Sequence, residues 1–368
     1  MDSTAFAKEI RIMSLFTPDR VVDIVPIGHG HINTTCAVKL QKDDGTQYRL
    51  LLQKINDYVF PDVEGLMDNI CRVTEYLKNH LNEGEDPLRS VMTVVPSLAG
   101  NSFEKTEDGY YRCYVMIEDT VSYQTIEKYG DFFNCGWAFG DFQRRLGDFP
   151  AHTLCETIKN FHNTESRYSD LVKSIETDKA GRKNQVEREI EFCLSRKHLA
   201  SAIVSKLADG TIPLRVTHND SKLNNMLFDK ASDRPLCIVD LDTVMPGAAC
   251  YDFGDAIRFG GTRTKEDETD LAKVGLDLEL FRAYTAGYLK AAKSFLTPAE
   301  IDTLAVSALV ITYENGMRFL KDYLDGDVYY GAKYPTQNLD RCRTHLKFVA
   351  DMETKLDEMK KIVAEYAQ

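Results

Sequence analysis

One polar segment of the chain combines residue types that can perform acid–base and metal chemistry. It lies between apolar runs and reads His218-Asn219-Asp220-Ser221-Lys222-Leu223-Asn224-Asn225. Asp220 and Asn225 stand five positions apart, and Asp240 ends the next apolar run, twenty positions after Asp220. Turn residues at 229–233 predict a hairpin that returns Asp240 to the side of Asn225. One carboxylate is then available to a substrate hydroxyl, while an amide oxygen and a second carboxylate are hard ligands of the kind that Mg²⁺ prefers.

The spacing of these residues matches the pattern H-x-D-x-x-x-x-N, in which an Asp accepts a hydroxyl proton and an Asn holds a metal during phosphoryl transfer. A solvated turn rich in Asn and Asp explains the composition, but not the spacing together with the flanking strands. His218 is expected to pack beneath the loop, because Asp220 already provides a base. Asp242 is either a further metal ligand, since strand alternation puts it on the same side as Asp240, or only a neighbour of that residue.

A second candidate is the glycine pair in Gly28-His29-Gly30-His31-Ile32-Asn33. The segment lacks a third glycine that opens a helix, so it does not fit the dinucleotide-binding fingerprint, and no GxxxxGK[ST] motif occurs in the chain. A strand–glycine–strand hairpin could cover a phosphate with its backbone N–H groups. A tight hairpin that needs positive φ explains the two glycines equally well.

Composition excludes several classes of protein. The 368 residues include 45 Lys and Arg against 57 Asp and Glu, a net charge of −12, which argues against a broad nucleic-acid or anionic-membrane surface. The length suggests two domains or one two-lobed unit. The nine cysteines are scattered singly, no signal peptide is evident, and no apolar run approaches the roughly 18 to 20 residues of a membrane span. We therefore expect a protein of the reducing cytoplasm.

The elements that must position these residues form a small β-rich part followed by a larger helical part. Residues 21–56 predict β-structure with a turn at 42–45, and further strands are expected at 91–97 and 110–117. Thr297-Pro298-Ala299-Glu300 predicts a helix start with a capping box. Helical spacing of apolar residues occurs at 2–15, 62–80, 131–146, 186–208, 277–293, 298–324 and 338–366.

Taken together, these features resemble the aminoglycoside phosphotransferase-like branch of the protein-kinase fold, and most closely the N-acetylhexosamine 1-kinases. The similarity runs from about residue 20 to residue 350, nearly the whole chain. The catalytic block is specific to the superfamily, and only the full set points to the hexosamine kinases. The blocks that carry the resemblance are Gly28 to Thr35, Leu214 to Leu227, Ile238 to Thr243, Tyr251 to Phe259 and Gly316 to Leu320.

The resemblance implies an α+β, two-lobed protein-kinase-like fold, with a β-rich N-lobe at 1–119 and a helical C-lobe at 120–368. It implies ATP- and Mg²⁺-dependent phosphorylation of the anomeric hydroxyl of N-acetylglucosamine or N-acetylgalactosamine, which gives a hexosamine 1-phosphate and ADP. The alternatives are a kinase of another small alcohol, such as choline, homoserine or an aminoglycoside, and a nucleotide-binding pseudokinase. We expect a monomer or weak homodimer with a small sugar substrate and no nucleic-acid or membrane partner.

The resemblance also implies roles for single residues at the nucleotide. Asp220 would be the catalytic base, and Asn225, Asp240 and Asp242 would hold the metal. Adenine would bind the backbone of Met116, Ile117 and Glu118, while Gly28 and Gly30 would cover the phosphates. The position of the ATP-pairing lysine falls on Gln53 or on Lys54, depending on the strand register, with Glu64 as the helix partner of Lys54. A solvated Lys54 and Glu64 is the alternative.

For the sugar, the resemblance points to His31, Phe259 and Arg318. His31 could reach polar sugar groups, Phe259 could pack on a pyranose face, and Arg318 could donate to ring hydroxyls or the acetamide. The alternative is that His31 is a turn residue, Phe259 a core aromatic and Arg318 a member of an ion pair on a helix surface. Asp252-Phe253-Gly254 looks like a kinase metal motif, but it follows Asp220 by thirty-two residues and Asp240 already fills that role. We interpret Asp252 as capping a helix and anchoring the catalytic backbone.

Overall fold

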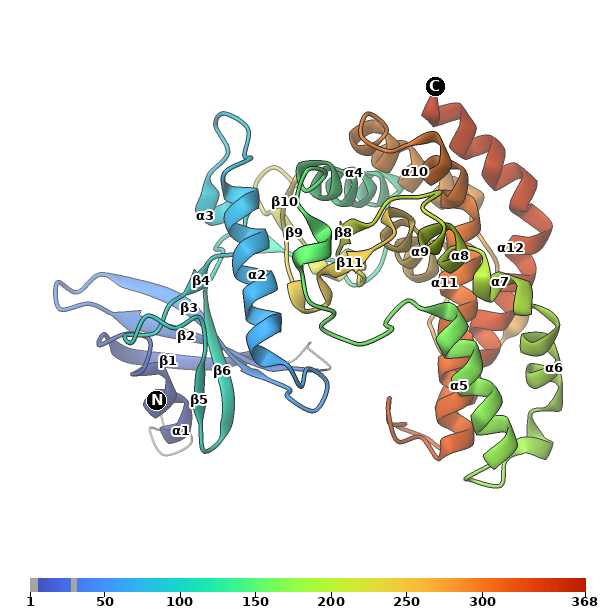
Figure 1. Ribbon diagram of the computed structural model, residues 1–368. Coiled ribbons are helices and arrows are strands. Elements are labelled where there is room, and N and C mark those ends of the chain that lie inside the picture. The colour runs from blue at the N-terminus through green and yellow to red at the C-terminus, as the bar shows by residue number, and fades with distance from the viewer. Residues whose placement is uncertain (1–5, 28–31) are drawn as a thin grey trace. The chain divides into compact units, whose positions relative to one another are not determined.

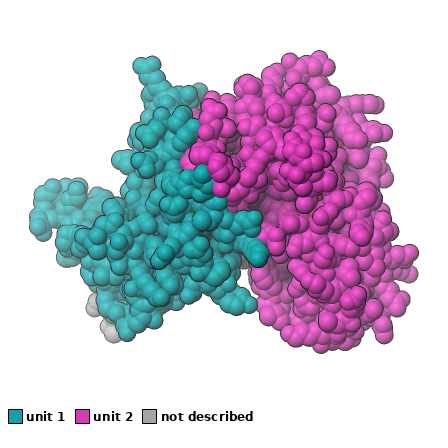
Figure 2. Space-filling view, in the orientation of Figure 1, with its two compact units in different colours: residues 1–121, 153–159, 227–244 teal, residues 122–152, 160–226, 245–368 magenta. Residues whose placement is uncertain are grey.

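The structure, a computed structural model, describes residues 6–27 and 32–368 (Figure 1). The chain divides into two compact units, coloured separately in Figure 2. Unit 1 comprises 1–121, 153–159 and 227–244, and unit 2 comprises 122–152, 160–226 and 245–368. Unit 1 therefore includes two later segments that the expected division at residue 119 assigns to the second lobe. The division into lobes at that residue stays a prediction.

Unit 1 is built on an antiparallel sheet with the strand order β1-β2-β3-β6-β4, and β5 pairs with β6. A second sheet has the order β10-β9-β7. The helix α3 spans Pro87–Ser90. The strands are β1 (Arg20–Ile27), β2 (Thr34–Gln41), β3 (Gln47–Ile55), β4 (Val94–Val95), β5 (Glu104–Thr106), β6 (Gly109–Val115), β7 (Thr120–Val121), β9 (Met226–Asp229) and β10 (Pro235–Ile238).

The two faces of the larger sheet carry different residues because side chains alternate along each strand. One face packs with α1 (Ala7–Met13) in an apolar core that includes Leu50 and Leu52 of β3. Lys54 continues this alternation and so points to the α1 face. The other face carries Gln53 and Arg112, which are register partners, and α2 (Val63–Lys78) supplies the Met67 sulfur beside Arg112.

Unit 2 is helical apart from the paired strands β8 and β11. The capping box at Thr297 and Glu300 is confirmed, and α11 begins at Pro298 as predicted. The fold class is likewise as predicted, an antiparallel sheet region followed by a helical region. The elements are α4 (Tyr129–Arg145), α5 (Thr164–Thr177), α6 (Glu187–Ser195), α7 (Lys197–Ser201), α8 (Val204–Ala208), β8 (Arg215–Thr217), β11 (Met245–Gly247), α9 (Ala249–Gly260), α10 (Leu278–Ala292), α11 (Pro298–Asp325) and α12 (Gln337–Ala367).

The structure corrects two helix predictions in unit 2. The helix expected over 186–208 is three short helices, interrupted at Arg196 and at Ala202 and Ile203. The helix α9 is absent from the periodicity prediction, although its polar residues Asp252, Asp255 and Arg258 recur every three positions along it. Among the described helices, none has both the length and the apolar character that crossing a bilayer requires.

Glycines allow α4 and α10 to approach closely, which positions the α4 side chains beneath the catalytic loop. A Cβ at Gly287 of α10 would clash with the backbone oxygen of Phe133 on α4. We expect Gly287→Ala to lower the free energy of unfolding by about 2–4 kcal/mol, because the atoms that the new methyl group would meet, on Phe133 and Trp137, are backbone and cannot move aside easily. Gly130→Ala, where a Cβ meets no atom within 4 Å, is the matched control and should change it by less than about 1 kcal/mol. Urea unfolding measures both, and equal stabilities of the two variants would refute this packing.

Candidate active site

The catalytic segment, residues 218–225, follows directly from β8. His218 and Asn219 are buried, and Asn219 adopts a left-handed backbone conformation with φ of 63° that turns the chain sharply. Asp220 then emerges with 24% of its side chain exposed. A single helical turn, Leu223–Asn225, closes the segment before β9. The turn therefore presents one carboxylate at the surface of an otherwise buried loop.

Two carboxylates on α9 hold the backbone of this segment. Asp252 is fully buried and accepts hydrogen bonds from the backbone N–H of His218 at 2.9 Å and of Asn219 at 2.7 Å. Asp255, one helical turn later, accepts from the N–H of Ser221 at 2.9 Å. The predicted anchoring role of Asp252 is confirmed. The predicted capping role is wrong, because Asp252 lies inside the first turn of α9 and the N-cap is Ala248.

Further contacts support these anchors from below. The Gln143 amide of α4 donates to Asp252 at 2.6 Å. The His218 ring is buried and meets Phe139 and Phe142 edge-on, with ring centroids 5.4 and 6.0 Å apart. His218 thus packs beneath the loop, as predicted.

Asp220 is held between a cation and an amide. The Lys222 Nζ lies 2.7 Å from its Oδ1, and the Asn225 Nδ2 donates to its Oδ2 at 3.0 Å and to its backbone oxygen at 2.8 Å. Burial acts to raise the pKa of Asp220, but the charges of Lys222, His218 and Arg258 outweigh it and leave the pKa below its ordinary value. Asp220 is therefore an oriented carboxylate at neutral pH, suited to accept a hydroxyl proton.

The predicted metal ligands fall in both units and are described within each. In unit 2, the amide nitrogen of Asn225 donates to Asp220, so the amide oxygen of Asn225 is the atom left to face a cation. In unit 1, Asp240 is exposed and has a left-handed φ of 62°. Both offer the hard oxygen atoms that Mg²⁺ prefers. No three His, Cys, Asp or Glu side chains within the described residues group into a metal site, so nucleotide phosphates would have to supply further ligands.

Asp242 lies in different surroundings from Asp240. The residue is 3% exposed, and its carboxylate forms an ion pair with Arg112 at 2.6 Å and accepts from the Asn33 amide at 2.5 Å. The alternation argument for a shared side with Asp240 is wrong, because β10 ends at Ile238 and Leu241–Thr243 form a helical turn.

The other residues expected at the nucleotide lie in unit 1. Gln53, rather than Lys54, shares a sheet face with Arg112, and Lys54 lies against Gly109 on the opposite face. Glu64 is exposed in the first turn of α2. Met116, Ile117 and Glu118 follow β6 directly, and Glu118 pairs with Arg49 at 2.7 Å. Gly28, Gly30 and His31 lie outside the described residues.

A network of interacting charged side chains extends from Asp220 through unit 2, and we call it the charge cluster. Arg258 bonds Asp255 at 2.8 Å, lies 3.3 Å from Glu266, and its charge also acts on Asp220. Arg341 lies 3.5 Å from the same Glu266. The members, joined by ion pairs or by direct charge interaction, are Asp220, Lys222, Asp255, Arg258, Glu266, Glu314, Arg318, Arg341 and Arg167.

Arg318 is the cation of this cluster that aromatic rings surround. Its guanidinium lies 5.2 Å from the Phe161 ring centroid and 5.5 Å from that of Tyr330. Within the described part of the chain, no carboxylate forms an ion pair with it. The buried Tyr330 hydroxyl also has no hydrogen-bond partner there, and burial raises the pKa of Tyr330 to about 12 despite the opposing charge of Arg318. Phe259 is half-buried near the end of α9.

Sequence reasoning singled out Arg318 but missed most of the charge cluster. Lys222 stood in the catalytic segment and could have been noticed as a cation two positions from the base. Glu266 and Arg341 are 75 positions apart, and no motif connects them. Arg112 did carry a signal, since it interrupts the apolar strand Gly109-Tyr110-Tyr111-Arg112-Cys113.

The buried His345 of α12 makes stability depend on pH. Burial lowers its pKa to about 4, and the nearby Glu266 only partly opposes this. In the unfolded chain this histidine binds a proton near pH 6.5, whereas in the folded chain it stays neutral down to about pH 4. Its contribution to the free energy of unfolding is therefore complete above pH 6.5 and is lost as the pH falls toward 4. Between pH 6.5 and 4.5 we expect the wild type to lose about 2 kcal/mol more than His345→Gln. Urea unfolding at both pH values checks this, with the exposed His198→Gln as control; a wild-type loss equal to that of His345→Gln would contradict it.

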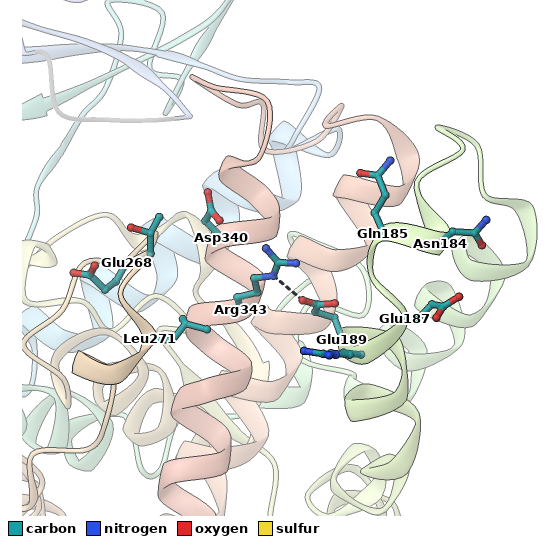
Figure 3. Close-up of a pocket in the computed structure, with 10 residues that line it drawn as sticks. Asn184, Gln185, Glu187, Glu189, Glu268, Leu271, Asp340 and Arg343 are labelled. Carbon is teal, nitrogen blue, oxygen red and sulfur yellow. Dashed lines mark hydrogen bonds and ion pairs between the residues drawn. The ribbon is translucent and has the colours of Figure 1, made fainter.

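Unit 2 also has a pocket of about 650 Å³ between its helices (Figure 3). Its lining includes Glu187, Glu268 and Asp340, while Arg343 is paired with Glu189 at 2.6 Å. None of the predicted site residues lines it.

Comparison with known proteins shows which fold the chain shares and which part of it resembles a known family. Residues 136–292, which include the catalytic segment and α9, match the model of the phosphotransferase enzyme family. The microcompartment-associated aminopropanol kinase is similar in structure, with 16% identity, a TM-score of 0.62 and coverage of 96% of this chain and 98% of that chain. The structural similarity establishes a kinase-like fold, and residues 136–292 carry the similarity to the phosphotransferase enzyme family.

Two further solved structures share the fold. Spectinomycin phosphotransferase in complex with ADP and spectinomycin has 12% identity and a TM-score of 0.58, and the alignment covers 96% of this chain and 98% of that one. Amicoumacin kinase in complex with AMP-PNP, Ca²⁺ and its antibiotic has 12% identity and a TM-score of 0.54, with 99% and 94% covered. At these identities the similarity establishes the fold.

Proposed function

We propose that the protein transfers the γ-phosphoryl group of ATP to the anomeric hydroxyl of a neutral sugar, an N-acetylhexosamine. The sequence resemblance supplies the sugar class. The single structural observation that supports it is the composition of the charge cluster around Asp220, which favours a neutral acceptor over a cationic one.

The charge cluster holds more cations than anions. Counting its Lys, Arg, Asp and Glu members alone, the five cations Arg167, Lys222, Arg258, Arg318 and Arg341 exceed by one the four carboxylates of Asp220, Asp255, Glu266 and Glu314. His345 adds nothing near neutral pH, because burial lowers its pKa to about 4. The carboxylates of the cluster already have cationic or hydrogen-bonding partners.

This charge balance bears on the choice of acceptor. Aminopropanol, after which one structural relative is named, is an amine and is protonated at neutral pH. An ammonium group beside Arg258 and Arg318 would meet like charge without a free carboxylate to pair with, and such juxtaposition costs several kcal/mol in binding. A neutral hexosamine avoids this cost.

The residues of unit 2 supply the groups that such a sugar requires. Phe161 and Phe259 offer apolar surface for a pyranose face, and Arg318 with the Tyr330 hydroxyl offers hydrogen-bond donors for an acetamide oxygen or ring hydroxyls. In the reaction, Asp220 orients the anomeric hydroxyl and takes its proton. The sugar oxygen then forms a bond to the γ-phosphorus as the bond to ADP breaks.

The remaining requirement is neutralisation of the phosphate charge. Asn225 and Asp240 would hold Mg²⁺, which when bound offsets the negative charge on the transferred phosphoryl group. Lys222 keeps Asp220 ionised and oriented through their 2.7 Å contact. Position and charge account for catalysis here, since the protein forms no covalent intermediate.

Release of ADP with a panel of acceptors tests the proposal. We expect turnover with N-acetylglucosamine or N-acetylgalactosamine and little with choline, homoserine, aminopropanol or kanamycin. Turnover with the cationic alcohols alone would refute the sugar assignment. Tight Mg·ATP binding without turnover of any acceptor would indicate a pseudokinase.

A variant pair locates the acceptor contact. Arg318→Lys keeps the charge but loses the planar fork of donors, and we expect the KM for the sugar to rise about tenfold with the KM for ATP unchanged. Arg188→Lys, at an exposed arginine of the same unit, is the matched control.

A further inference from the structure

A fully buried arginine lies in the sheet of unit 1. The side chain of Arg112, on β6, is 2% exposed, and its guanidinium bonds the Gln53 Oε1 from Nε at 2.8 Å and from Nη2 at 2.6 Å. Its ion-pair partner is Asp242, at 2.6 Å. Burial acts to lower the pKa of Arg112, but Asp242 outweighs it, so the pKa lies above its ordinary value. Burying such a pair costs several kcal/mol per ion in desolvation, so simple packing does not explain it.

The position next to Arg112 is where protein kinases carry their phosphate-pairing lysine, on the strand β3. Here that face of β3 presents the neutral Gln53, whose amide also donates to the Thr35 hydroxyl at 2.8 Å. Lys54 points to the opposite face. The cation beside Gln53 on this face is Arg112, its register partner on the neighbouring strand β6.

The carboxylate that pairs with this cation also comes from a different element than in protein kinases. In protein kinases the lysine pairs with a glutamate from the helix that packs on the sheet. The corresponding helix here, α2, approaches Arg112 with the Met67 sulfur at 3.7 Å, and its Glu64 is exposed. The carboxylate that meets Arg112 instead comes from Asp242, two residues after the exposed Asp240.

A short chain of contacts connects the sheet to the loop of Asp240. Asp242 accepts from the Asn33 amide at 2.5 Å, and the Asn33 oxygen accepts from the backbone N–H of Asn56 at 2.9 Å. Asp242 is thus held from β6 on one side and from the start of β2 on the other. Its Oδ1 lies 2.6 Å from the Arg112 guanidinium and its Oδ2 accepts from the Asn33 amide, an arrangement that suits a counterion better than a metal ligand.

We propose that the pair Arg112–Asp242 replaces the lysine–glutamate pair of protein kinases and positions the loop that carries Asp240 for Mg·nucleotide binding. This inference rests on the proposed kinase function and reassigns Asp242 from metal ligand to counterion. Arg112 and Asp242 are positioning residues: they act through Asp240.

Binding of Mg·ADP, measured by calorimetry, tests this inference without any acceptor. We expect Arg112→Lys and Asp242→Asn each to weaken binding about tenfold or more and to raise the Mg²⁺ concentration that half-saturates it. Because the two residues act as one unit, the double variant should bind no more weakly than the weaker single variant. Arg20→Lys, at an exposed arginine of β1, is the matched control. All variants are measured well below their melting temperatures, so that a loss of fold cannot imitate the effect.

The outcomes separate this inference from the proposed function. Folded variants that bind Mg·ADP and Mg²⁺ like the wild type overturn the positioning role and leave the proposed function intact. If the losses of Mg·ADP binding energy in the two single variants add up in the double variant, Arg112 and Asp242 act independently, and the proposal that they work as a pair is overturned. A wild type that binds no Mg·ADP overturns the kinase function together with this inference.

Discussion

Asp220→Asn lowers the turnover number by about 10²- to 10⁴-fold, the usual contribution of a positioned general base, while Mg·ADP affinity stays within about twofold. An amide has the shape of the carboxylate but cannot accept the hydroxyl proton. Lys222 and Asn225, which contact Asp220, remain in place to preserve the loop. Steady-state kinetics with the preferred acceptor and calorimetry with Mg·ADP measure the two quantities separately.

The control for this variant is Asp357→Asn, at an exposed aspartate of α12 in the same unit, which should retain wild-type kinetics. Near-normal turnover in Asp220→Asn would show that another group accepts the proton. A parallel loss of Mg·ADP affinity would show that Asp220 acts in nucleotide binding, contrary to the role assigned here.

Asp252→Asn has the second large effect, on stability and turnover together. The buried carboxylate accepts from two backbone N–H groups and from the Gln143 amide. An asparagine offers one oxygen in place of two and sets an N–H₂ group against a backbone donor. Leaving a buried donor unsatisfied costs about 1–3 kcal/mol, and the lost bonds are charge-assisted, so we expect a loss of about 2–4 kcal/mol in the free energy of unfolding.

Turnover should fall in the same variant, because the bonds to His218 and Asn219 fix the backbone that carries Asp220 and small displacements of a catalytic group are costly. Urea unfolding and kinetics below the melting temperature report the two effects. Asp357→Asn again serves as the control. Unchanged stability would mean that these hydrogen bonds do not anchor the loop.

Local signals were enough to predict much of the fold. The capping box at Thr297 and Glu300 depends on residues three positions apart, and the turn at 42–45 on four consecutive residues, so both can be recognised in the sequence. The spacing of Asp220 and Asn225 belongs to one loop, and the structure brings them into contact. The anchoring role of Asp252 was predicted because Asp252 follows Asp220 by thirty-two residues, which argues against a metal-binding role.

The sequence could not reveal features that depend on distant partners. The ion pair of Arg112 and Asp242 connects positions 130 residues apart, and the one local sign was a charge within an apolar strand. Strand alternation wrongly placed Asp242 on the same side as Asp240, because Asp240 adopts a left-handed conformation that ends the alternation. The bounds of α9 were not predicted, although Asp252, Asp255 and Arg258 recur every three positions along it.

The most direct measurement of the central claim is ³¹P NMR of a mixture of the enzyme, Mg·ATP and N-acetylglucosamine or N-acetylgalactosamine. We predict a sugar 1-phosphate signal that grows in equal amount with ADP, and its loss with Asp220→Asn. ATP that stays intact with both sugars but is consumed with choline, aminopropanol or kanamycin would contradict the account.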